Sequence, residues 1–318
     1  MEWVLDVEVC ISSDGIRTVR LDGVLEPSFS GRLDLGAPYY RAVRALSSYV
    51  RAHAPEDERA AGEALVAVLE PEDARHDLER FLTVRLAAGE RVRLGLDFGA
   101  SRLSAFPFTL AGRSTGPWGL HPSLLLERRV EGTSPARRSR ADLSRVEGVL
   151  ARGEVSGPRN ASVVVYEGHG LPGMGSRPFR LTWPKRPLDP ETLSARLEAR
   201  FPEARLLWIG CCQGPHRHLS HVGVSGPGFE QLARASGRPV LAFHGAVRTE
   251  ALSVSRAWLR EAASITNPAA LVAQTRRALR VHPQPDLAAE WHRPLAVRPI
   301  HRSAPAAPLP EEIRHAPV

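Results

Sequence analysis

Two mainly apolar segments of the sequence each lead into residues that can perform covalent chemistry. Residues 161–166 lead into Glu167-Gly168-His169-Gly170, and residues 205–209 lead into Gly210-Cys211-Cys212-Gln213-Gly214. A thiolate attacks a carbonyl carbon readily, and a nearby imidazole can take the thiol proton and later give it to the leaving amine. A histidine and a cysteine delivered by two buried strands therefore predict a thiol-nucleophile site.

Each of these residues has an expected role. We predict Cys212 as the nucleophile, with Cys211 as the second choice, and His169 as the general base and acid. The oxyanion of the tetrahedral intermediate needs hydrogen-bond donors, and the backbone N–H groups of Gly170 and Cys212 are the natural candidates. A glycine beside the histidine would also let a substrate carbonyl approach closely.

The first half of the chain predicts a hairpin, helices and two strands. Residues 3–11 and 16–25 flank a Ser-Ser-Asp-Gly turn, a pattern typical of a β-hairpin. Between residues 39 and 89, apolar residues recur every three or four positions, which predicts roughly three amphipathic helices. The elements that we expect after these are strands at 92–98 and 123–130 and a short helix through Leu143, Val146 and Leu150.

From residue 161 onward, strands and helices alternate. This pattern predicts a mainly parallel sheet with helices on both faces. Asp189-Pro190 and Asn267-Pro268 each place an N-cap residue before a proline at the first helical position, so they mark helix starts. The predicted strands are 161–166, 205–210 and 239–243, and the predicted helices are 189–201, 227–236, 249–262 and 267–280.

The predicted sheet brings the histidine and the cysteine together. In open α/β sheets, ligands bind beyond the carboxyl ends of the strands. Right-handed crossovers place strands 161–166 and 205–210 in one sheet, where we expect them to be neighbours. We therefore expect His169 and Cys212 to lie just past two strand ends and to face one substrate.

Composition argues against several classes of protein. The formal net charge is +7, but all except one of the 42 lysine and arginine residues are arginine, and they are scattered among acidic residues, so no nucleic-acid partner is expected. The apolar runs fall short of the roughly 18 residues that a membrane span needs, so no membrane partner is expected either. The N-terminus does not have the pattern of a signal peptide. Three cysteines cannot form a disulfide framework, which predicts a cytoplasmic protein.

Two other kinds of site can be derived from the same residues. The segment 168–173 matches the dinucleotide fingerprint G-x-G-x-x-G, but Pro172, Pro178 and Pro184 forbid the helix that this motif must open. A metal site is conceivable, but adjacent cysteines chelate poorly compared with C-x₂₋₄-C spacing. Its ligands would be Cys211, Cys212, His216, His218 and His221. We therefore expect neither a cofactor nor a metal ion.

The order and spacing of the motifs resemble a known family. The caspase signature Q-A-C-[RQG]-G is similar to residues 210–214, and a caspase histidine lies about 50 residues upstream. Here His169 precedes Cys212 by 43 positions. More closely, the chain resembles the CHAT domains, which are caspase- and separase-like cysteine peptidases. That family shows a strand ending in His-Gly, a strand ending in small-small-Cys, and then a helix and a strand like residues 237–243.

The resemblance implies a fold and a division of the chain. It implies a caspase-like three-layer α/β/α sandwich with a mainly parallel central sheet, formed by residues 91–281. Residues 1–90 would add an N-terminal hairpin and a helical region, either part of this domain or packed on it. Residues 282–318 are rich in Pro, His and Ala and are predicted to be a disordered tail. Cys212 is favoured over Cys211 because small residues precede it, as in the family.

The resemblance also implies an activity. Such enzymes hydrolyse peptide bonds in a protein substrate, without a cofactor. In bacteria they often act in defence or cell death on a partner encoded nearby, such as a pore-forming gasdermin-like protein. The segment 106–109 stands where the family has a Leu-Pro-Trp-Glu-like motif, but it lacks the Trp and the Glu. This departure supports a second hypothesis, a catalytically inactive CHAT-like module that binds peptides or regulates a partner.

Overall fold

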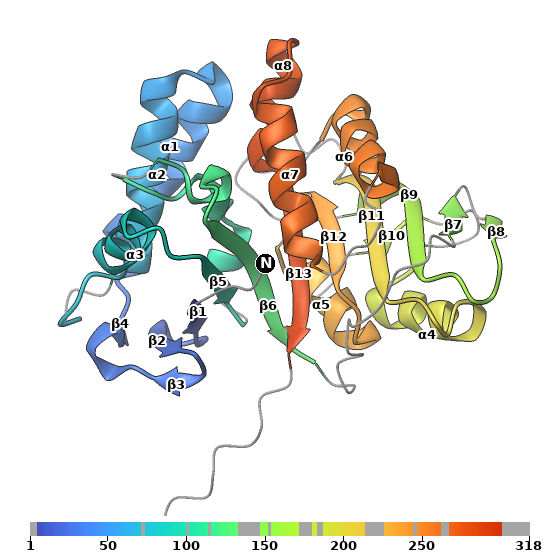
Figure 1. The fold of residues 1–318 in the computed structure, drawn as a ribbon, viewed down its shortest axis with the longest axis horizontal. Helices are drawn as coiled ribbons and strands as arrows, with labels where there is room; N and C mark the ends of the chain where they lie inside the picture. Colours follow the sequence, from blue (N-terminus) through green and yellow to red (C-terminus); the bar gives the residue numbers. More distant parts are fainter. Residues whose placement is uncertain are drawn as a thin grey trace, which may run out of the picture.

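One twisted β-sheet runs through the molecule, and helices pack against it (Figure 1). The computed structural model describes residues 5–70, 74–99, 102–113, 116–132, 147–151, 154–171, 180–182, 187–213, 226–243, 247–261 and 267–300. Within these residues, thirteen strands form the sheet, and its main path has the order β3-β2-β1-β5-β6-β13-β12-β11-β9-β7-β8. Two short strands pair beside this path, β10 with β9 and β4 with β2.

The elements of the described residues have the following bounds. The strands are β1 Leu5–Ile11, β2 Ile16–Leu21, β3 Val24–Leu25, β4 Gly31–Arg32, β5 Val92–Asp97, β6 Leu124–Glu131, β7 Glu147–Ala151, β8 Glu154–Ser156, β9 Val163–Leu171, β10 Arg180–Leu181, β11 Leu206–Gln213, β12 Val240–Phe243 and β13 Pro294–Ile300. The α-helices are α1 Ala37–Ala52, α2 Pro55–Leu69, α3 Leu78–Ala87, α4 Pro190–Arg200, α5 Gly226–Ser236, α6 Thr249–Glu261, α7 Pro268–Arg280 and α8 Pro285–Ala288. The 3₁₀ helices are η1 Pro27–Phe29, η2 Arg102–Ala105, η3 Phe108–Leu110, η4 Trp118–Leu120 and η5 Ala289–His292.

The predicted α/β fold with a mainly parallel central sheet is confirmed. Strands β1, β5, β6 and β13 run parallel to one another and form one group, and strands β12, β11, β9 and β7 run parallel to one another and form a second group. The two groups meet at β12 and β13, which are antiparallel. The carboxyl ends of the first group therefore lie at the opposite edge of the sheet from those of the second group (Figure 1).

The predicted helix starts in the second half of the chain are also confirmed. The side chain of Asp189 accepts a hydrogen bond from the backbone N–H of Thr192, and that of Asn267 accepts one from Ala269. Each satisfies a backbone donor that has no partner inside the helix, and proline at the first helical position needs no such partner. These caps fix where α4 and α7 begin.

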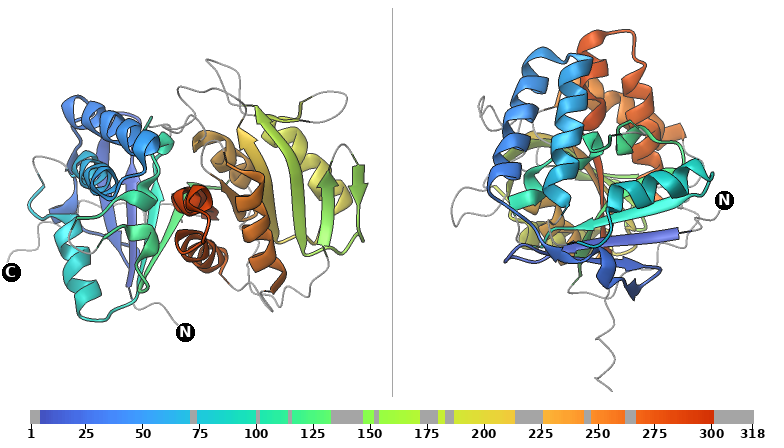
Figure 2. Two further views of the ribbon diagram at one scale, coloured as in Figure 1. Left: turned by 90° about the horizontal axis from the view of Figure 1, so that it is seen from above. Right: turned by 90° about the vertical axis from the view of Figure 1, so that its left-hand side faces the viewer.

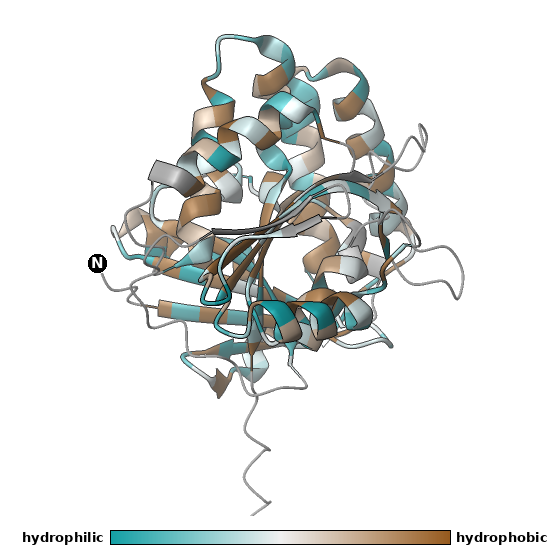
Figure 3. Cartoon of the chain, turned by 90° about the vertical axis from the view of Figure 1, so that its right-hand side faces the viewer, coloured by the Kyte–Doolittle hydropathy of each residue, from teal (hydrophilic) through white to brown (hydrophobic). Residues whose placement is uncertain are grey.

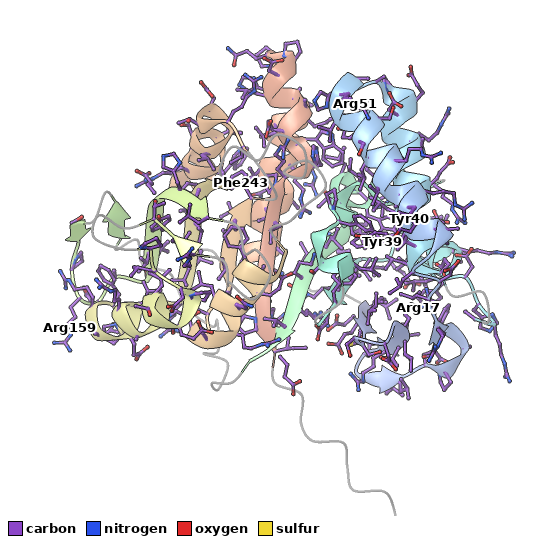
Figure 4. The ribbon with its side chains drawn as sticks, turned by 180° about the vertical axis from the view of Figure 1, so that it is seen from behind. Arg17, Tyr39, Tyr40, Arg51, Arg159 and Phe243 are labelled. Atoms are coloured by element: carbon purple, nitrogen blue, oxygen red, sulfur yellow. The ribbon has the colours of Figure 1, made fainter. Side chains whose placement is uncertain are left out.

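The second half of the chain forms three layers. One face of β9, β11 and β12 packs against α4 and α5, and the other face packs against α6 and α7. Figure 3 shows hydrophobic residues concentrated in the central sheet and on the helix surfaces that face it. Phe243, at the end of β12, lies inside the molecule among the residues that α6 and α7 cover (Figure 4). Each large apolar side chain buried here contributes roughly 1.5–3 kcal/mol.

The first half of the chain has its own core on the same sheet. Apolar residues of β1 and β5 pack against α1, α2 and α3. Helix α7 joins the two halves, because Leu279 belongs to this core while Leu271 packs in the second half. In Figure 2, α7 lies between the blue-green and the yellow-green parts of the molecule. The N-terminal hairpin shares the sheet with β5, because β1 pairs with β5 in parallel.

The predicted disordered tail is wrong for residues 282–300. These residues form α8, η5 and β13, and Trp291 and Val297 are fully buried. The many prolines suggested disorder, but two of them occupy positions in β13 that tolerate proline. Pro294 is the first residue of the strand, and Pro299 lies beyond the end of β12 and pairs only with β6. At such positions a missing N–H interrupts little of the ladder. Residues 301–318 lie outside the described part of the chain.

The short helix predicted around Leu143, Val146 and Leu150 is also wrong where the structure describes it. Residues 147–151 form β7, which pairs with β9 on one side and β8 on the other. Three apolar residues at helical spacing are too few to distinguish a helix from a short strand, and pairing with β9 decides between them. Residues 143–146 lie outside the described part of the chain.

A buried carboxylate joins the two halves of the molecule. Glu58 of α2 accepts hydrogen bonds from Nη1 and Nη2 of Arg280 at 2.6 and 3.0 Å, and from Nε1 of Trp291 at 3.3 Å. The carboxylate is 10 % exposed, whereas the Arg280 side chain is 41 % exposed. This planar two-bond contact connects α2 to α7.

We predict that Arg280→Ala lowers the free energy of unfolding by about 2 kcal/mol, because it leaves the Glu58 carboxylate buried with fewer partners. Urea unfolding measures this change. Arg85→Ala is the control, since it removes an exposed ion pair with Glu90 and should change stability by less than about 0.5 kcal/mol. Equal losses in the two variants would contradict a special role for Glu58.

A second buried charge cluster lies where η2 and β6 meet α5. Nη2 of Arg128 donates to the carbonyl oxygen of Phe106 at 2.6 Å, and its guanidinium lies 4.1 Å from the centroid of the Phe98 ring. Burial lowers the pKa of Arg128 to about 10. Burial raises the pKa of Glu230 to about 7, against the opposing charge of Arg128 and with a further contribution from Asp97. Glu230 therefore changes charge near neutral pH.

We predict that the free energy of unfolding of the Glu230→Gln variant increases relative to that of wild type as pH rises from 5 to 8. The folded state holds the Glu230 proton more tightly than the unfolded state, so wild-type stability falls between the unfolded pKa and about 7, while glutamine does not titrate. The expected gain over this range is about 1–3 kcal/mol. Thermal unfolding at both pH values measures it, with Glu191→Gln as the control, because Glu191 is an exposed residue of α4. A stability difference between Glu230→Gln and wild type that does not change with pH would contradict the raised pKa of Glu230.

Candidate active site

The strands that carry the predicted dyad are direct neighbours. Strands β9 and β11 are parallel and pair over eight successive positions, and the Cα of Cys212 is paired with the Cα of His169. Adjacent strands lie about 4.8 Å apart. The backbone therefore places the two predicted catalytic positions side by side.

Their position along the strands differs from the prediction. We expected both residues just past the strand ends, but β9 continues to Leu171 and β11 to Gln213, so both lie inside strands. The physical reason is continued pairing, because β10 adds an antiparallel partner to Gly170 and Leu171. Backbone groups that have ladder partners stay in the sheet.

The two cysteines occupy different positions relative to the faces of the sheet. Successive residues of a strand belong to opposite faces. Cys211 pairs with Gly168 and is fully buried on the face that α4 and α5 cover. Position 212 is the next residue of β11, so it belongs to the opposite face, which it shares with position 169. His169 is exposed on that face. A substrate that reaches His169 does not reach the thiol of Cys211, which favours Cys212 as the nucleophile.

The glycines before the dyad make room for two aromatic side chains. A Cβ at Gly210 would collide with the indole of Trp208, and a Cβ at Gly168 would collide with the phenol of Tyr166. Each aromatic ring therefore lies along its own strand toward the dyad, on opposite faces of the sheet. Trp208 is on the face of His169, and Tyr166 is on the face of Cys211.

The backbone of His169 is held by Thr182, which follows β10. The N–H of His169 donates to Oγ1 of Thr182 at 3.0 Å, and the N–H of Thr182 donates to the carbonyl oxygen of His169 at 2.8 Å. The hydroxyl of Tyr166 donates to the carbonyl oxygen of Thr182 at 2.7 Å. Burial raises the pKa of Tyr166 to about 12, so this phenol stays protonated as a donor. These contacts fix the backbone at the histidine.

Gly170 occupies a more enclosed position than its predicted role requires. It is buried and pairs with Gln213 of β11 on one side and Leu181 of β10 on the other. A donor to an oxyanion must point at the reacting atom, whereas a residue between two strands lies within their ladders. Its role in an oxyanion hole stays a prediction.

Four residues near the dyad were not predicted from the sequence: Thr182, Glu167, Arg256 and Trp208. Glu167 and Trp208 stand two and four positions before the dyad residues of their strands, a spacing that could have assigned them to the same face. Thr182 and Arg256 carry no such signal, because only the fold brings β10 and α6 to this place.

The two alternative sites considered from the sequence were a dinucleotide-binding motif and a metal site. Residues 168–171 are strand, not the start of a helix, so the dinucleotide fingerprint lacks its structural context. Of the conceivable metal ligands, His216, His218 and His221 lie outside the described residues. Within the described residues, no group of three or more His, Cys, Asp or Glu side chains could hold a metal ion.

The segment 106–109 has a packing role. Phe106 and Phe108 are buried in the core of the first half, and Oγ1 of Thr109 donates to the carbonyl oxygen of His292 at 2.8 Å. These contacts account for the residue types there without assigning them to the site.

Comparison with protein-family models and with curated proteins finds no match to this chain. The resemblance to CHAT domains therefore rests on the residues themselves. A membrane span would need a long apolar helix, and the described residues include none.

We predict that Gly210→Ala lowers the free energy of unfolding by about 1–3 kcal/mol, because the added methyl group must displace the buried indole of Trp208. Chemical unfolding measures the loss. Adding Trp208→Phe to Gly210→Ala should recover part of it, since the smaller ring leaves space beside residue 210. A Gly210→Ala variant as stable as wild type would show that the indole does not lie there.

Proposed function

We propose that this chain is a caspase-like cysteine endopeptidase that uses Cys212 as nucleophile and His169 as general base and acid. The observation that carries the proposal is the pairing of these two positions on neighbouring parallel strands. Burial of Cys211 on the opposite face supports the choice of Cys212. The exposure of His169 leaves the imidazole accessible to a substrate.

The proposed reaction has two steps. The imidazole of His169 takes the proton of the Cys212 thiol, and the sulfur attacks the carbonyl carbon of the scissile peptide bond. As the tetrahedral intermediate collapses, the C–N bond breaks and the imidazolium gives its proton to the leaving amine. Water then attacks the thioester, with His169 as base, and releases the acid and the free thiol.

The chain supplies the other requirements from its backbone and its sheet. The oxyanion would be stabilised by backbone N–H groups, with Gly170 and Cys212 as the candidates. Thr182 would hold the histidine backbone in place during both proton transfers. No cofactor takes part in this chemistry. We place the enzyme in the cytoplasm, with a protein as substrate. By the family resemblance, it would act in defence or cell death and cut a partner such as a pore-forming gasdermin-like protein.

A second function has one observation in its favour. Residues 106–109 lack the Trp and Glu of the family motif and are used for core packing instead. A catalytically inactive module that binds peptides at the same edge of the sheet would tolerate this change. Both dyad residues would then be dispensable for binding.

Peptide acyloxymethyl-ketone probes test the proposal. We expect them to label the purified wild-type protein, to label Cys211→Ser equally, and to label Cys212→Ser not at all, because only Cys212 is the nucleophile. His169→Ala should lower the labelling rate by about 100-fold or more, since general-base assistance typically contributes that much. Labelling is measured by intact-protein mass spectrometry.

Two outcomes would contradict the proposal. Labelling that persists in Cys212→Ser would assign the reactivity to another residue. Wild-type protein that stays unlabelled, also with candidate partner proteins present, would favour the binding module.

A further inference from the structure

Helix α6 contacts both strands of the proposed dyad through one group of side chains. The guanidinium of Arg256 on α6 forms an ion pair with Glu167 of β9. The same guanidinium lies 5.9 Å from the ring centroid of Trp208 on β11. The indole Nε1 of Trp208 donates to Oγ of Ser255 at 3.1 Å. Two successive residues of α6 therefore reach both strands.

These contacts lie close to the dyad along each strand. Glu167 stands two positions before His169, and Trp208 stands four positions before Cys212, so all four positions share one face of the sheet. Residue 210 between Trp208 and Cys212 is glycine, and the indole covers it. The indole is buried and the Arg256 side chain is 14 % exposed, so neither offers a surface on which a substrate can rest.

We propose that Arg256 is a positioning residue for the dyad, acting through Glu167 on the strand of His169 and through Trp208 on the strand of Cys212. The proposal rests on the proposed function, because it assigns a role within that reaction. Arginine suits the task, since its planar guanidinium can pair with a carboxylate while it lies against an aromatic ring. The ion pair is half exposed at Glu167, so its direct contribution to stability is small and its effect is on geometry.

The rate of alkylation of Cys212 by iodoacetamide tests the proposal without requiring peptide cleavage. Tandem mass spectrometry separates modification of Cys212 from that of Cys211. We expect Arg256→Gln and Glu167→Gln each to lower the rate at Cys212 about fivefold, as loss of about 1 kcal/mol of coupling would do. The double variant should lose no more than either single variant, because both remove the same contact.

Buried Cys211 is an internal control for unfolding. If Arg256 only stabilises the fold, its loss should raise alkylation of Cys211, whereas we expect Cys211 to stay protected. Arg248→Gln is the matched variant, because Arg248 forms an exposed ion pair with Asp286 just before α6. It should leave both rates unchanged. Arg256→Lys keeps the charge and should recover part of the rate at Cys212.

If the protein turns over a peptide, the same variants should lower kcat about fivefold with KM unchanged. Three results would overturn the proposal: an unchanged Cys212 rate in Arg256→Gln, additive losses in the double variant, or increased labelling of Cys211. Failure of the proposed function is a separate outcome. It appears as wild-type protein that ketone probes do not label, while the coupling between Arg256 and Cys212 alkylation can still be present.

Discussion

The parallel pairing of β9 with β11 is the constraint on which the proposed site depends. A shift of one residue between these strands would move position 212 away from position 169, and Cys211 would take its place on the face of His169. The register is fixed by burial on both faces, since Val163 and Trp208 must meet one pair of helices while Val164 and Leu207 meet the other. Core packing thus decides which of the two cysteine positions shares a face with position 169.

Much of this arrangement could be predicted from local sequence. The N-caps Asp189 and Asn267 define helix starts by a mechanism that acts within four residues, and both are confirmed. The apolar runs before His169 and Cys212 are long enough to indicate buried strands. Their adjacency followed from the handedness of crossovers, so the candidate dyad could be chosen before the fold was known.

The missed features depend on contacts between distant parts of the chain. Strand β7 has too few apolar residues to distinguish it from a helix, and β13 is strand only because β6 and β12 provide partners on both sides. The same holds for Thr182 and Arg256, whose residue types are common on protein surfaces. No periodicity in the sequence connects them to His169. Local pattern therefore indicates the two positions of the proposed dyad better than it indicates the residues that contact them.

The place of β13 in the sheet has a consequence for how the protein is made. Within the described residues, the sheet passes from β6 to β12 only through β13, which is the last strand in the sequence. During synthesis both halves can collapse early, but each keeps an open edge, β6 in one and β12 in the other, until residues 294–300 leave the ribosome. Open apolar edges invite pairing with other chains. The pairings of β13 therefore come last in the assembly of this sheet, and a nascent chain that stalls before residue 294 keeps both of these edges open.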